Sequence, residues 1–300
     1  MSDHGEKRCG FVAIIGAPNA GKSTLVNTLV GQKVAIVSPK VQTTRARLMG
    51  IAVQNHTQLV LIDTPGMFTP KKTLEDAMVA AARDGATNSD LILFLVDAQR
   101  GLTEEVEEIL EWLESLQTPK MLCLTKVDIA RKDRLLILTQ RLNRRGQFAE
   151  TFMISATKDD GITDLKEALL AAMPRGPWHF PEDQVADVSS RLLAAEVTRE
   201  KLFLQLRQEV PYASAVETES YEEKDGAIAI HQTIYVERDG QKAIVLGKGG
   251  ARIKEIGTAS RTDLEDMLGK RVHLFLNVKV KADWSERPEM LEAFGMERRS

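Results

Sequence analysis

The sequence predicts an α/β fold in which a domain with a mixed, mostly parallel sheet is followed by a smaller α+β domain. In the first half of the chain, short apolar runs alternate with segments of helical periodicity, an order typical of a sheet covered by helices on both faces. In the second half the order becomes helix, strand, strand, helix, strand. A chain of 300 residues is long enough for two domains of ordinary size.

The elements of the first half follow from this periodicity. Leu91–Val96 is a continuous apolar run typical of a buried strand, and Thr103 is a suitable N-cap for the helix that follows. The expected strands span residues 11–15, 48–54, 58–62, 91–96, 120–124 and 151–154, and the expected helices span residues 22–30, 104–116, 134–143 and 165–172. Because ligands bind beyond the carboxyl ends of the strands in such sheets, a site is expected in the loops that follow them.

The boundary between the two domains is predicted at residues 173–181, where proline and glycine cluster and a helix cannot continue. Beyond it, the expected helices span residues 191–209 and 251–267, and the expected strands span residues 213–222, 228–236 and 271–281. The predicted organisation is a first domain over residues 8–178, a linker over 179–190, a second domain over 191–285 and a C-terminal tail over 286–300.

Composition argues against several classes of protein. The net charge of −3 excludes a protein coated with basic charge but is compatible with a local basic patch. Cys9 and Cys123 lie far apart without a CxxC spacing, so neither a disulfide framework nor a zinc site is indicated. The longest apolar run is far shorter than the roughly 20 residues of a membrane-spanning helix. Since the N-terminal residues also lack the apolar stretch of a secretory signal, we expect a cytoplasmic protein.

A phosphate-binding loop follows the first expected strand. Residues 16–23 have the sequence GAPNAGKS, which matches the P-loop pattern between a strand and a helix. The glycines let backbone N–H groups point at phosphate oxygens, Lys22 reaches the β- and γ-phosphates, and the Ser23 hydroxyl ligates Mg²⁺. The nucleotide-binding residues predicted here are Asn19, Ala20, Gly21, Lys22, Ser23 and Thr24.

Three more motifs follow strands in the order that a guanine-nucleotide site requires. In DTPG at residues 63–66, Asp63 can hold the magnesium water shell and Gly66 lets the backbone approach the γ-phosphate. In TKVD at residues 125–128, Asp128 can accept the N1–H and exocyclic amine of guanine, a donor pair that adenine lacks. The residues predicted to bind GTP or GDP in these motifs are Asp63, Gly66, Thr125, Lys126, Asp128, Ser155, Ala156 and Thr157.

These motifs resemble the G1, G3, G4 and G5 motifs of translation-factor-class GTPases, which are Ras-like P-loop NTPases. The resemblance implies hydrolysis of GTP to GDP and phosphate. Residues 41–45, VQTTR, resemble the switch I motif of the TrmE-Era-EngA group, so that Thr44 would join Ser23 and Asp63 around Mg²⁺, with Thr43 beside it. The chain departs from the usual pattern at Thr125, where an asparagine would offer both a donor and an acceptor.

The residue that activates water is not the usual one. Ras-type enzymes orient the attacking water with a glutamine directly after the D-x-x-G motif, but Met67 stands there and can only pack. The resemblance to potassium-dependent members of the group implies that Asn19 ligates K⁺, with backbone oxygens around residues 38–40 completing the shell. Arg45 is an alternative as an arginine finger, although we expect it to be a solvated switch residue.

A second candidate site lies in the α+β domain. Residues 247–250, GKGG, precede a helical stretch, and a G-x-x-G loop that opens a helix is typical of KH domains, which clamp about four unpaired nucleotides. Nine basic and four acidic residues lie between positions 242 and 281, although a basic helix can also be merely a solvated surface. Ile244, Ile253 and Ile256 are expected beside the bases. The predicted RNA-binding residues are Gly247, Lys248, Gly249, Gly250, Arg252 and Lys254.

Taken together, the chain resembles the Era family of bacterial GTPases. Besides the motifs above, the resemblance extends to residues 199–202, 209–212, 234–238 and 272–276. It implies a Ras-like domain followed by a type II KH domain, a monomer that binds 16S ribosomal RNA near its 3′ end in 30S subunit maturation, and peripheral association with the inner membrane. Two alternatives stay open at this stage: a tRNA-modification GTPase of the same group, and an RNA-binding module whose nucleotide domain is not catalytic.

Overall fold

The computed structural model describes residues 6–41, 43–45, 48–70, 73–287 and 290, and forms two compact units. The first contains residues 1–35, 44–71 and 78–187, and the second contains residues 36–43, 72–77 and 188–300. Of the residues named in the sequence analysis, Gln42 in the switch motif and most of the tail expected at 286–300 lie outside the described residues.

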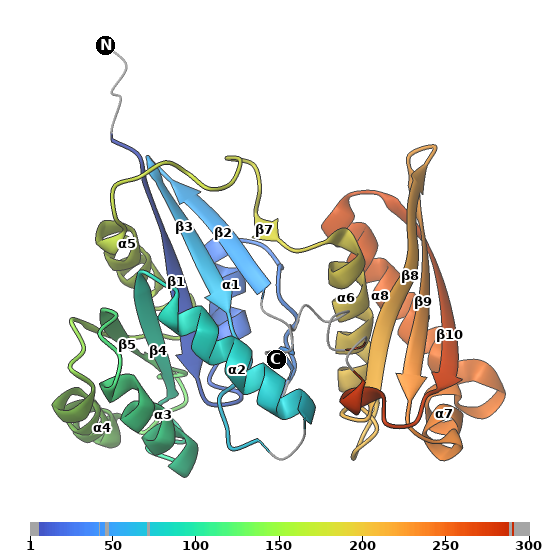
Figure 1. The fold of residues 1–300 in the computed structure, drawn as a ribbon, viewed down its shortest axis with the longest axis horizontal. Helices are drawn as coiled ribbons and strands as arrows, with labels where there is room; N and C mark the ends of the chain where they lie inside the picture. The colour runs from blue at the N-terminus through green and yellow to red at the C-terminus, as the bar shows by residue number, and fades with distance from the viewer. Residues whose placement is uncertain (1–5, 42, 46–47, 71–72, 288–289, 291–300) are drawn as a thin grey trace. The chain divides into compact units, whose positions relative to one another are not determined.

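The first unit is built on a seven-stranded sheet with the order β6-β5-β4-β1-β3-β2-β7. Its central strands are parallel, whereas β2 runs antiparallel to both β3 and β7 (Figure 1). The strands are β1 (Arg8–Gly16), β2 (Leu48–Gln54), β3 (Thr57–Asp63), β4 (Leu91–Asp97), β5 (Lys120–Thr125), β6 (Thr151–Met153) and β7 (Ala186–Asp187). The parallel order brings the carboxyl ends of β1, β3, β4 and β5 to one edge of the sheet.

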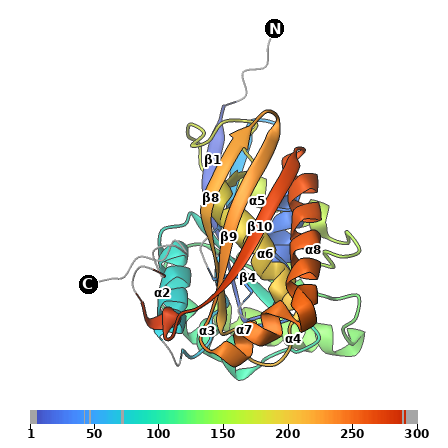
Figure 2. The same cartoon turned by 90° about the vertical axis from the view of Figure 1, so that its right-hand side faces the viewer.

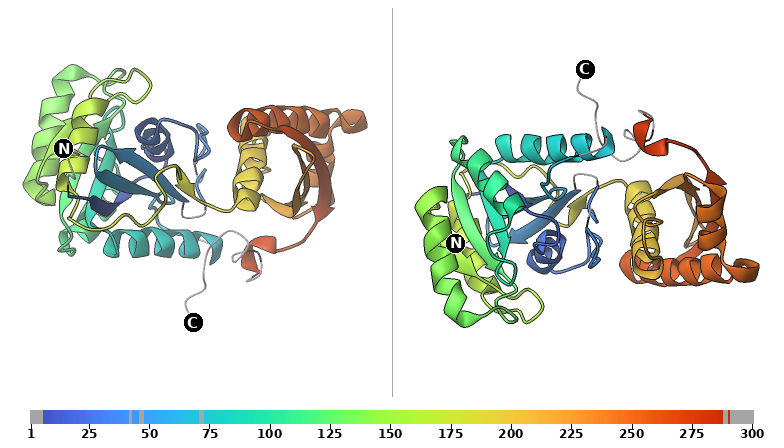
Figure 3. Two further views of the ribbon diagram at one scale, coloured as in Figure 1. Left: turned by 90° about the horizontal axis from the view of Figure 1, so that it is seen from above. Right: turned by 90° about the horizontal axis from the view of Figure 1, so that it is seen from below.

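Helices cover both faces of this sheet, and α1 and α2 lie on opposite sides of it (Figure 3). They are α1 (Lys22–Val30), α2 (Thr73–Thr87), α3 (Glu104–Glu114), α4 (Lys132–Gly146) and α5 (Ile162–Ala172). On the face of α2, α3 and α4, alternate residues of β1, β4 and β5 enter one apolar core, among them Ile15, Phe94 and Leu122. This alternation explains why the central strands are apolar on both sides and read as continuous apolar runs.

Two elements of this unit were not predicted. Helix α2 has an apolar row with a spacing of four residues, at Leu74, Met78, Ala82 and Ala86, and this row is buried. That pattern was available in the sequence. Strand β7, in contrast, is only two residues long, too short to show a sequence pattern. It is a strand because it pairs with β2.

The proline-rich segment that follows α5 is attached to the first unit by Gln58. The side chain of Gln58, which is fully buried in β3, accepts hydrogen bonds from the backbone N–H groups of His179 and Phe180, both at 3.0 Å, and donates to the Phe180 carbonyl at 2.8 Å. A glutamine amide can make all of these bonds at once, because it offers both an acceptor oxygen and a donor nitrogen. Part of the expected linker is therefore held by side-chain contacts that its composition did not reveal.

The second unit has a three-stranded sheet with the order β10-β9-β8, in which the strands lie side by side (Figure 2). β9 runs antiparallel to β8 and parallel to β10. The elements are α6 (Ser190–Gln205), β8 (Ser214–Lys224), β9 (Ala227–Val236), α7 (Asp239–Leu246), the 3-10 turn Lys248–Gly250, α8 (Ala251–Leu268) and β10 (Arg271–Val280), followed by the 3-10 turn Trp284–Glu286. One apolar core joins all three helices to the sheet, with Leu202, Val245, Ile256 and Val278 among its members.

One sequence expectation for this unit was wrong, and one helix was not predicted. Helix α6 ends at Gln205 and not at Glu209, and the next residues form turns. Helix α7 was missed because it is short and contains Gly240, a weak helix former. It begins where the Gln241 side chain accepts hydrogen bonds from the backbone N–H groups of Glu237 and Arg238, at 2.9 and 3.2 Å. In the described part of the chain, no helix has the length and apolar character needed to cross a membrane.

Candidate nucleotide and nucleic-acid sites

The loop between β1 and α1 adopts the conformation that its glycines predict. Asn19 and Gly21 have φ angles of 64° and 92°, so the backbone curls through the left-handed region. Gly16 is required by packing, since a Cβ there would lie 2.5 Å from the carbonyl oxygen of Leu95. Gly66 leaves little room for a side chain, because a Cβ at that position would approach Pro18 of the loop to 3.0 Å. The DTPG motif is thus packed directly on the P-loop.

Lys22 is enclosed by this loop. Its ammonium donates hydrogen bonds to the carbonyl oxygens of Gly16 at 3.1 Å and Ala17 at 3.0 Å, and the residue is only 6% exposed. Burial lowers the pKa of Lys22 to about 8, although the nearby negative charge of Asp63 acts in the opposite direction. An ammonium that is held out of water in this way is suited to bind an anionic ligand such as a phosphate.

The three residues predicted to bind magnesium lie together. The Ser23 hydroxyl is 2.7 Å from Oδ2 of Asp63 and 2.9 Å from the Thr44 hydroxyl, and the Thr44 hydroxyl is 3.2 Å from the same carboxylate oxygen. Hydroxyl and carboxylate oxygens are the ligands that Mg²⁺ prefers, so this set fits the ion. Asp63 reaches this place because it is the last residue of β3, beside β1 in the sheet.

The neighbours of Asp63 hold the motif in place. The Thr64 hydroxyl, which the sequence analysis overlooked, donates to the carbonyl of Ile14 in β1 at 2.7 Å. Met67 is buried in the apolar core that α2, α3 and α4 share, as its side-chain chemistry predicts. A thioether in this position has no group that could orient a water molecule.

The TKVD motif is joined to the P-loop by two of its side chains. The Thr125 hydroxyl donates to the carbonyl of Ala20 at 2.8 Å, so this threonine forms a bridge between the two loops. The Lys126 ammonium donates to the carbonyl of Asn19 and to Oδ2 of Asp97, each at 2.7 Å. Asp97 was not singled out from the sequence, although an aspartate directly after a buried apolar strand was a usable signal.

Asp128 is exposed at the end of this loop. Within the described part of the chain its carboxylate makes no hydrogen bond, so both oxygens can accept from a ligand. The last loop of the set lies after β6, beside β5. There Ser155 is buried, with its backbone N–H and carbonyl both bonded to Asp160, and its hydroxyl lies 3.3 Å from that of Thr157. Ala156 lies between these two residues and is partly exposed.

One expectation for the switch residues was wrong. Arg45 is not solvated but 1% exposed, so it is a buried residue of the first unit. The residues before Thr44 cluster with the second unit: Glu200 of α6 accepts the backbone N–H of Val37 at 2.8 Å, and Arg199 donates to the carbonyl of Thr43. The Thr43 hydroxyl lies 2.9 Å from that of Ser38. Sequence reasoning singled out Thr43 but gave no sign of these partners on α6.

The GKGG loop of the second unit needs glycine at three positions, since Gly247, Gly249 and Gly250 have φ angles of 71°, 60° and 79°. Their surroundings differ. A Cβ at Gly247 would lie 2.6 Å from Cβ of Arg252, whereas Gly249 and Gly250 face open space. Lys248 and Lys254 are exposed, and Arg252 is half-buried on the first turn of α8. The loop thus presents backbone and positive charge to solvent.

The three isoleucines expected beside the bases divide into two groups. Ile244 is 48% exposed on α7, which is compatible with a binding surface. Ile256 is fully buried, and Ile253 packs partly buried against the same core, so the expectation was wrong for Ile256. The helical spacing of Ile253 and Ile256 places both on the inner side of α8, where they pack against the apolar core.

Two family models match the chain, one in each unit. Residues 11–126 match a model described as 50S ribosome-binding GTPase, and residues 209–285 match a model described as KH domain. The chain is 55% identical over 291 residues to GTPase Era of Afipia carboxidovorans, covering 97% of this chain and 94% of the relative. It is 53% identical over 295 residues to GTPase Era of Erythrobacter litoralis, with 97% of each covered. This chain belongs to the Era family of GTPases.

Solved structures of the family agree with this assignment. A variant of Aquifex aeolicus Era bound to GDP and AlF₄⁻, and an Era complex with MgGDPNP and nucleotides 1506–1542 of 16S ribosomal RNA, each match with a TM-score of 0.92 and 39% identity. Both alignments cover 97% of this chain and 100% of the other chain. The predicted fold, a P-loop GTPase domain with a mixed sheet followed by a KH domain, is confirmed, and so is the prediction of a GTPase.

Proposed function

We propose that this GTPase binds GTP with Mg²⁺ at the carboxyl edge of β1, β3 and β5, and binds single-stranded RNA near the 3′ end of 16S ribosomal RNA with its KH unit during 30S subunit maturation. The Era complex that holds MgGDPNP together with this part of 16S ribosomal RNA supports both functions. The observation that carries the nucleotide site is the enclosure of Lys22 beside the oxygen cluster of Ser23, Thr44 and Asp63.

The phosphate half of the site is assigned to residues 19–24 and to Asp63 and Gly66. Backbone N–H groups of the P-loop surround the phosphates, and Lys22 donates to the β- and γ-phosphates. Ser23, Thr44 and Asp63 would hold Mg²⁺, which neutralises charge on the phosphates when it is bound. Because Thr44 reaches this cluster from the switch segment, loss of the γ-phosphate would release it.

The base half of the site is assigned to Thr125, Lys126 and Asp128, and to residues 155–157. Asp128 accepts two hydrogen bonds from guanine, Lys126 lies along the base, and the Ala156 N–H donates to the guanine carbonyl. Thr125 supports the pocket through its bond to Ala20 and does not need to touch the base. The absence of an asparagine amide at this position is therefore compatible with guanine binding.

Exchange of Asp128 for asparagine tests the base assignment. An amide at this position offers a donor where guanine also offers a donor, whereas xanthine offers an acceptor there. We expect Asp128→Asn to bind xanthosine triphosphate more tightly than GTP, measured by competition against a fluorescent nucleotide. An unchanged preference for GTP would show that Asp128 is not the residue that reads the base.

Hydrolysis is proposed to depend on potassium through Asn19. Met67 is buried and cannot orient water, so the charge that develops on the phosphates needs another source of stabilisation. K⁺ bound to Asn19 would supply positive charge beside the phosphates. Steady-state GTP hydrolysis should be faster in KCl than in NaCl at equal ionic strength, and Asn19→Ala should lose this difference. Equal rates for the wild type in the two salts would exclude the mechanism.

RNA binding is assigned to the KH unit, for which we retain the boundaries 191–285, with 8–178 as the GTPase domain. Gly247, Gly249 and Gly250 allow the RNA backbone to approach closely, and Lys248, Arg252 and Lys254 supply charge. The protein is proposed to act as a cytoplasmic monomer that associates peripherally with the inner membrane. Sedimentation of purified protein with and without vesicles of bacterial lipid measures both properties, and a dimer or an absence of co-sedimentation would refute the corresponding statement.

A further inference from the structure

The ammonium of Lys126 joins three segments of the first unit. It donates hydrogen bonds to the carbonyl oxygen of Asn19 in the P-loop and to Oδ2 of Asp97 at the end of β4, each at 2.7 Å. Lys126 itself follows β5, and its φ of 57° lies in the left-handed region, which lysine seldom adopts. Both acceptors are protein atoms, so the position of the ammonium does not depend on a ligand.

Asp97 reaches Lys126 because of the register of the sheet. β4 pairs parallel with β5, and Asp97 lies opposite Thr125, the last residue of β5. The backbone N–H of Ala98 donates to the carbonyl of Thr125 at 3.0 Å, so the pairing continues to the end of both strands. The residue after Thr125 therefore begins its turn beside the Asp97 carboxylate.

The two oxygens of the Asp97 carboxylate have different partners. Oδ1 accepts the backbone N–H groups of Gln99 at 2.9 Å and Arg100 at 3.4 Å, and these bonds shape the turn after β4. Oδ2 accepts from the Lys126 ammonium. The turn also contacts the P-loop, because the Arg100 guanidinium donates to the carbonyl of Pro18 at 3.3 Å. One aspartate thus combines a structural bond to its own turn with a separate bond to the TKVD motif.

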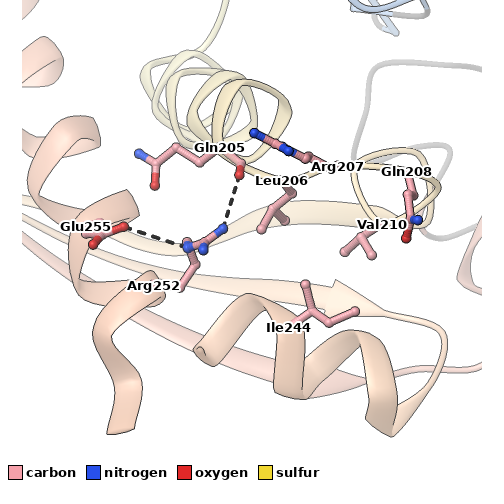
Figure 4. Close-up of a pocket in the computed structure, with 8 residues that line it drawn as sticks. All are labelled: Gln205, Leu206, Arg207, Gln208, Val210, Ile244, Arg252 and Glu255. Atoms are coloured by element: carbon pink, nitrogen blue, oxygen red, sulfur yellow. Dashed lines mark hydrogen bonds and ion pairs between the residues drawn. The ribbon is translucent and has the colours of Figure 1, made fainter. Parts of the chain in front are cut away.

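Burial distinguishes this ion pair from the one beside the GKGG loop. The side chain of Asp97 is 7% exposed and that of Lys126 is 36% exposed. Arg252 and Glu255, which line a cavity of the second unit, are 3.7 Å apart, and their side chains are 42% and 67% exposed (Figure 4). Water screens the attraction in an exposed pair and much less in a buried one. Asp97 therefore restrains Lys126 more strongly than Glu255 restrains Arg252.

The restraint on Lys126 matters because its aliphatic stem is the part that lies along the base in the proposed nucleotide site. A flexible lysine side chain loses much of its conformational freedom when a ligand packs against it. A side chain whose charged end is already fixed by the protein loses less, and the difference favours binding. For one long side chain this difference corresponds to an affinity gain of about three- to tenfold.

We infer that Asp97 is a positioning residue for guanine nucleotides, which acts through Lys126. Its Oδ2 anchors the ammonium at the P-loop, so that the stem of Lys126 lies along one face of the base. Asp97 does not touch the nucleotide itself, and it favours GTP and GDP equally because both carry the same base. This role rests on the base half of the proposed nucleotide site, and it adds a residue from β4, a strand to which that site assigns none.

Asp97→Asn separates the two bonds of this carboxylate. An amide keeps an acceptor oxygen for the N–H groups of Gln99 and Arg100, but it presents an NH₂ group, which cannot accept a hydrogen bond, to Lys126. Affinity for GDP and for GTP should fall alike by about fivefold, measured by competition against a fluorescent guanine nucleotide. The single-turnover rate of hydrolysis at saturating GTP should match the wild type, because the phosphate contacts are kept. A lower rate would point to a damaged P-loop and overturn the positioning role.

Asp133→Asn is the matched control for this exchange. Asp133 pairs with Arg131 at the same N–O distance of 2.7 Å, but the two side chains are 63% and 65% exposed and lie outside the proposed site. An exposed pair contributes little, so this variant should bind GDP and GTP like the wild type. Equal losses of affinity in the two asparagine variants would overturn the role of Asp97.

A double-mutant cycle with Lys126→Met tests whether Asp97 acts through Lys126. Methionine keeps an apolar stem but has no ammonium, so Asp97→Asn should lower the affinity of this variant further by less than about twofold. Effects that multiply in the double variant would overturn the inference. A loss of affinity in Lys126→Met with none in Asp97→Asn would overturn it as well, and would leave the proposed base site intact. If Lys126→Met binds GDP like the wild type, the proposed base site fails and the role of Asp97 fails with it.

Discussion

The two glycine-rich loops of this protein each carry one lysine, and the two lysines differ in their exposure to solvent. In the P-loop, Lys22 is 6% exposed and bonded to two carbonyl oxygens, and burial lowers its pKa to about 8. In the GKGG loop, Lys248 is exposed, and Gly249 and Gly250 face open space. The first loop therefore suits one ligand of fixed shape, and the second suits a polymer whose phosphates stay in contact with water. A desolvated lysine interacts strongly with a bound nucleotide because water does not screen its charge. A solvated lysine makes weaker contacts with RNA phosphates, and these contacts depend on salt concentration.

The largest expected effect is that of Lys22→Ala on GTP binding. Two hydrogen bonds from a charged donor contribute about 1.5–3 kcal/mol each, so GTP affinity should fall by about 100-fold or more. RNA affinity of the same variant, measured without nucleotide, should match that of the wild type. Isothermal titration with GTP and fluorescence anisotropy with RNA measure the two quantities. A loss of fewer than about ten-fold in GTP affinity would contradict the proposed role of the enclosed ammonium.

Gly249→Asp makes the corresponding change in the other loop. The position has a φ of 60°, which aspartate tolerates better than most residues, and a side chain there meets no neighbour within 4 Å. The carboxylate should repel RNA phosphates and weaken RNA binding by about thirtyfold, equivalent to about 2 kcal/mol. The thermal transition should shift little, and Gly249→Asn controls for the backbone. Equal RNA binding by the Asp and Asn variants would exclude charge as the cause.

The pH dependence of GTP binding reports directly on the buried lysine. Below pH 8 the Lys22 ammonium is charged, whereas above pH 8 the free protein must take up a proton before it can bind a triphosphate. The dissociation constant should therefore rise by about tenfold between pH 7 and pH 9. Lys22→Arg, whose guanidinium stays charged throughout, should lack this rise. The same slope in both proteins would assign the pH dependence to another group.

The smallest effect is expected for Lys248→Ala. An exposed lysine that contacts one phosphate contributes modestly, so RNA affinity should fall about threefold at physiological salt. The slope of the logarithm of affinity against the logarithm of salt concentration should become shallower by about 0.7–0.9. Anisotropy titrations at several KCl concentrations measure this slope. A slope identical to that of the wild type would mean that Lys248 does not touch the RNA backbone.

Sequence reasoning succeeded where a motif specifies its own conformation. The P-loop, the DTPG turn and the GKGG loop carry glycine where φ is positive or another chain segment comes too close for a side chain, as at Gly21, Gly66 and Gly249. The predicted strand boundaries were also close to the observed ones. The apolar runs of β1, β4 and β5 are buried on both faces, so the sequence marks where each strand begins and ends. Helix α2 was missed although its buried row at Leu74, Met78 and Ala82 was readable.

The sequence by itself determined the class of the two domains and the GTPase activity, and it predicted the residues that bind the triphosphate. Only the tertiary structure decided that Arg45 is buried, that Thr125 binds the Ala20 carbonyl, and that Asp97 is the partner of Lys126. It also placed Gln205, Ile244 and Arg252 around one cavity. Such contacts join residues far apart in the chain, and their burial depends on what packs against them. Local residue patterns record backbone preferences and apolar periodicity, but not those partners.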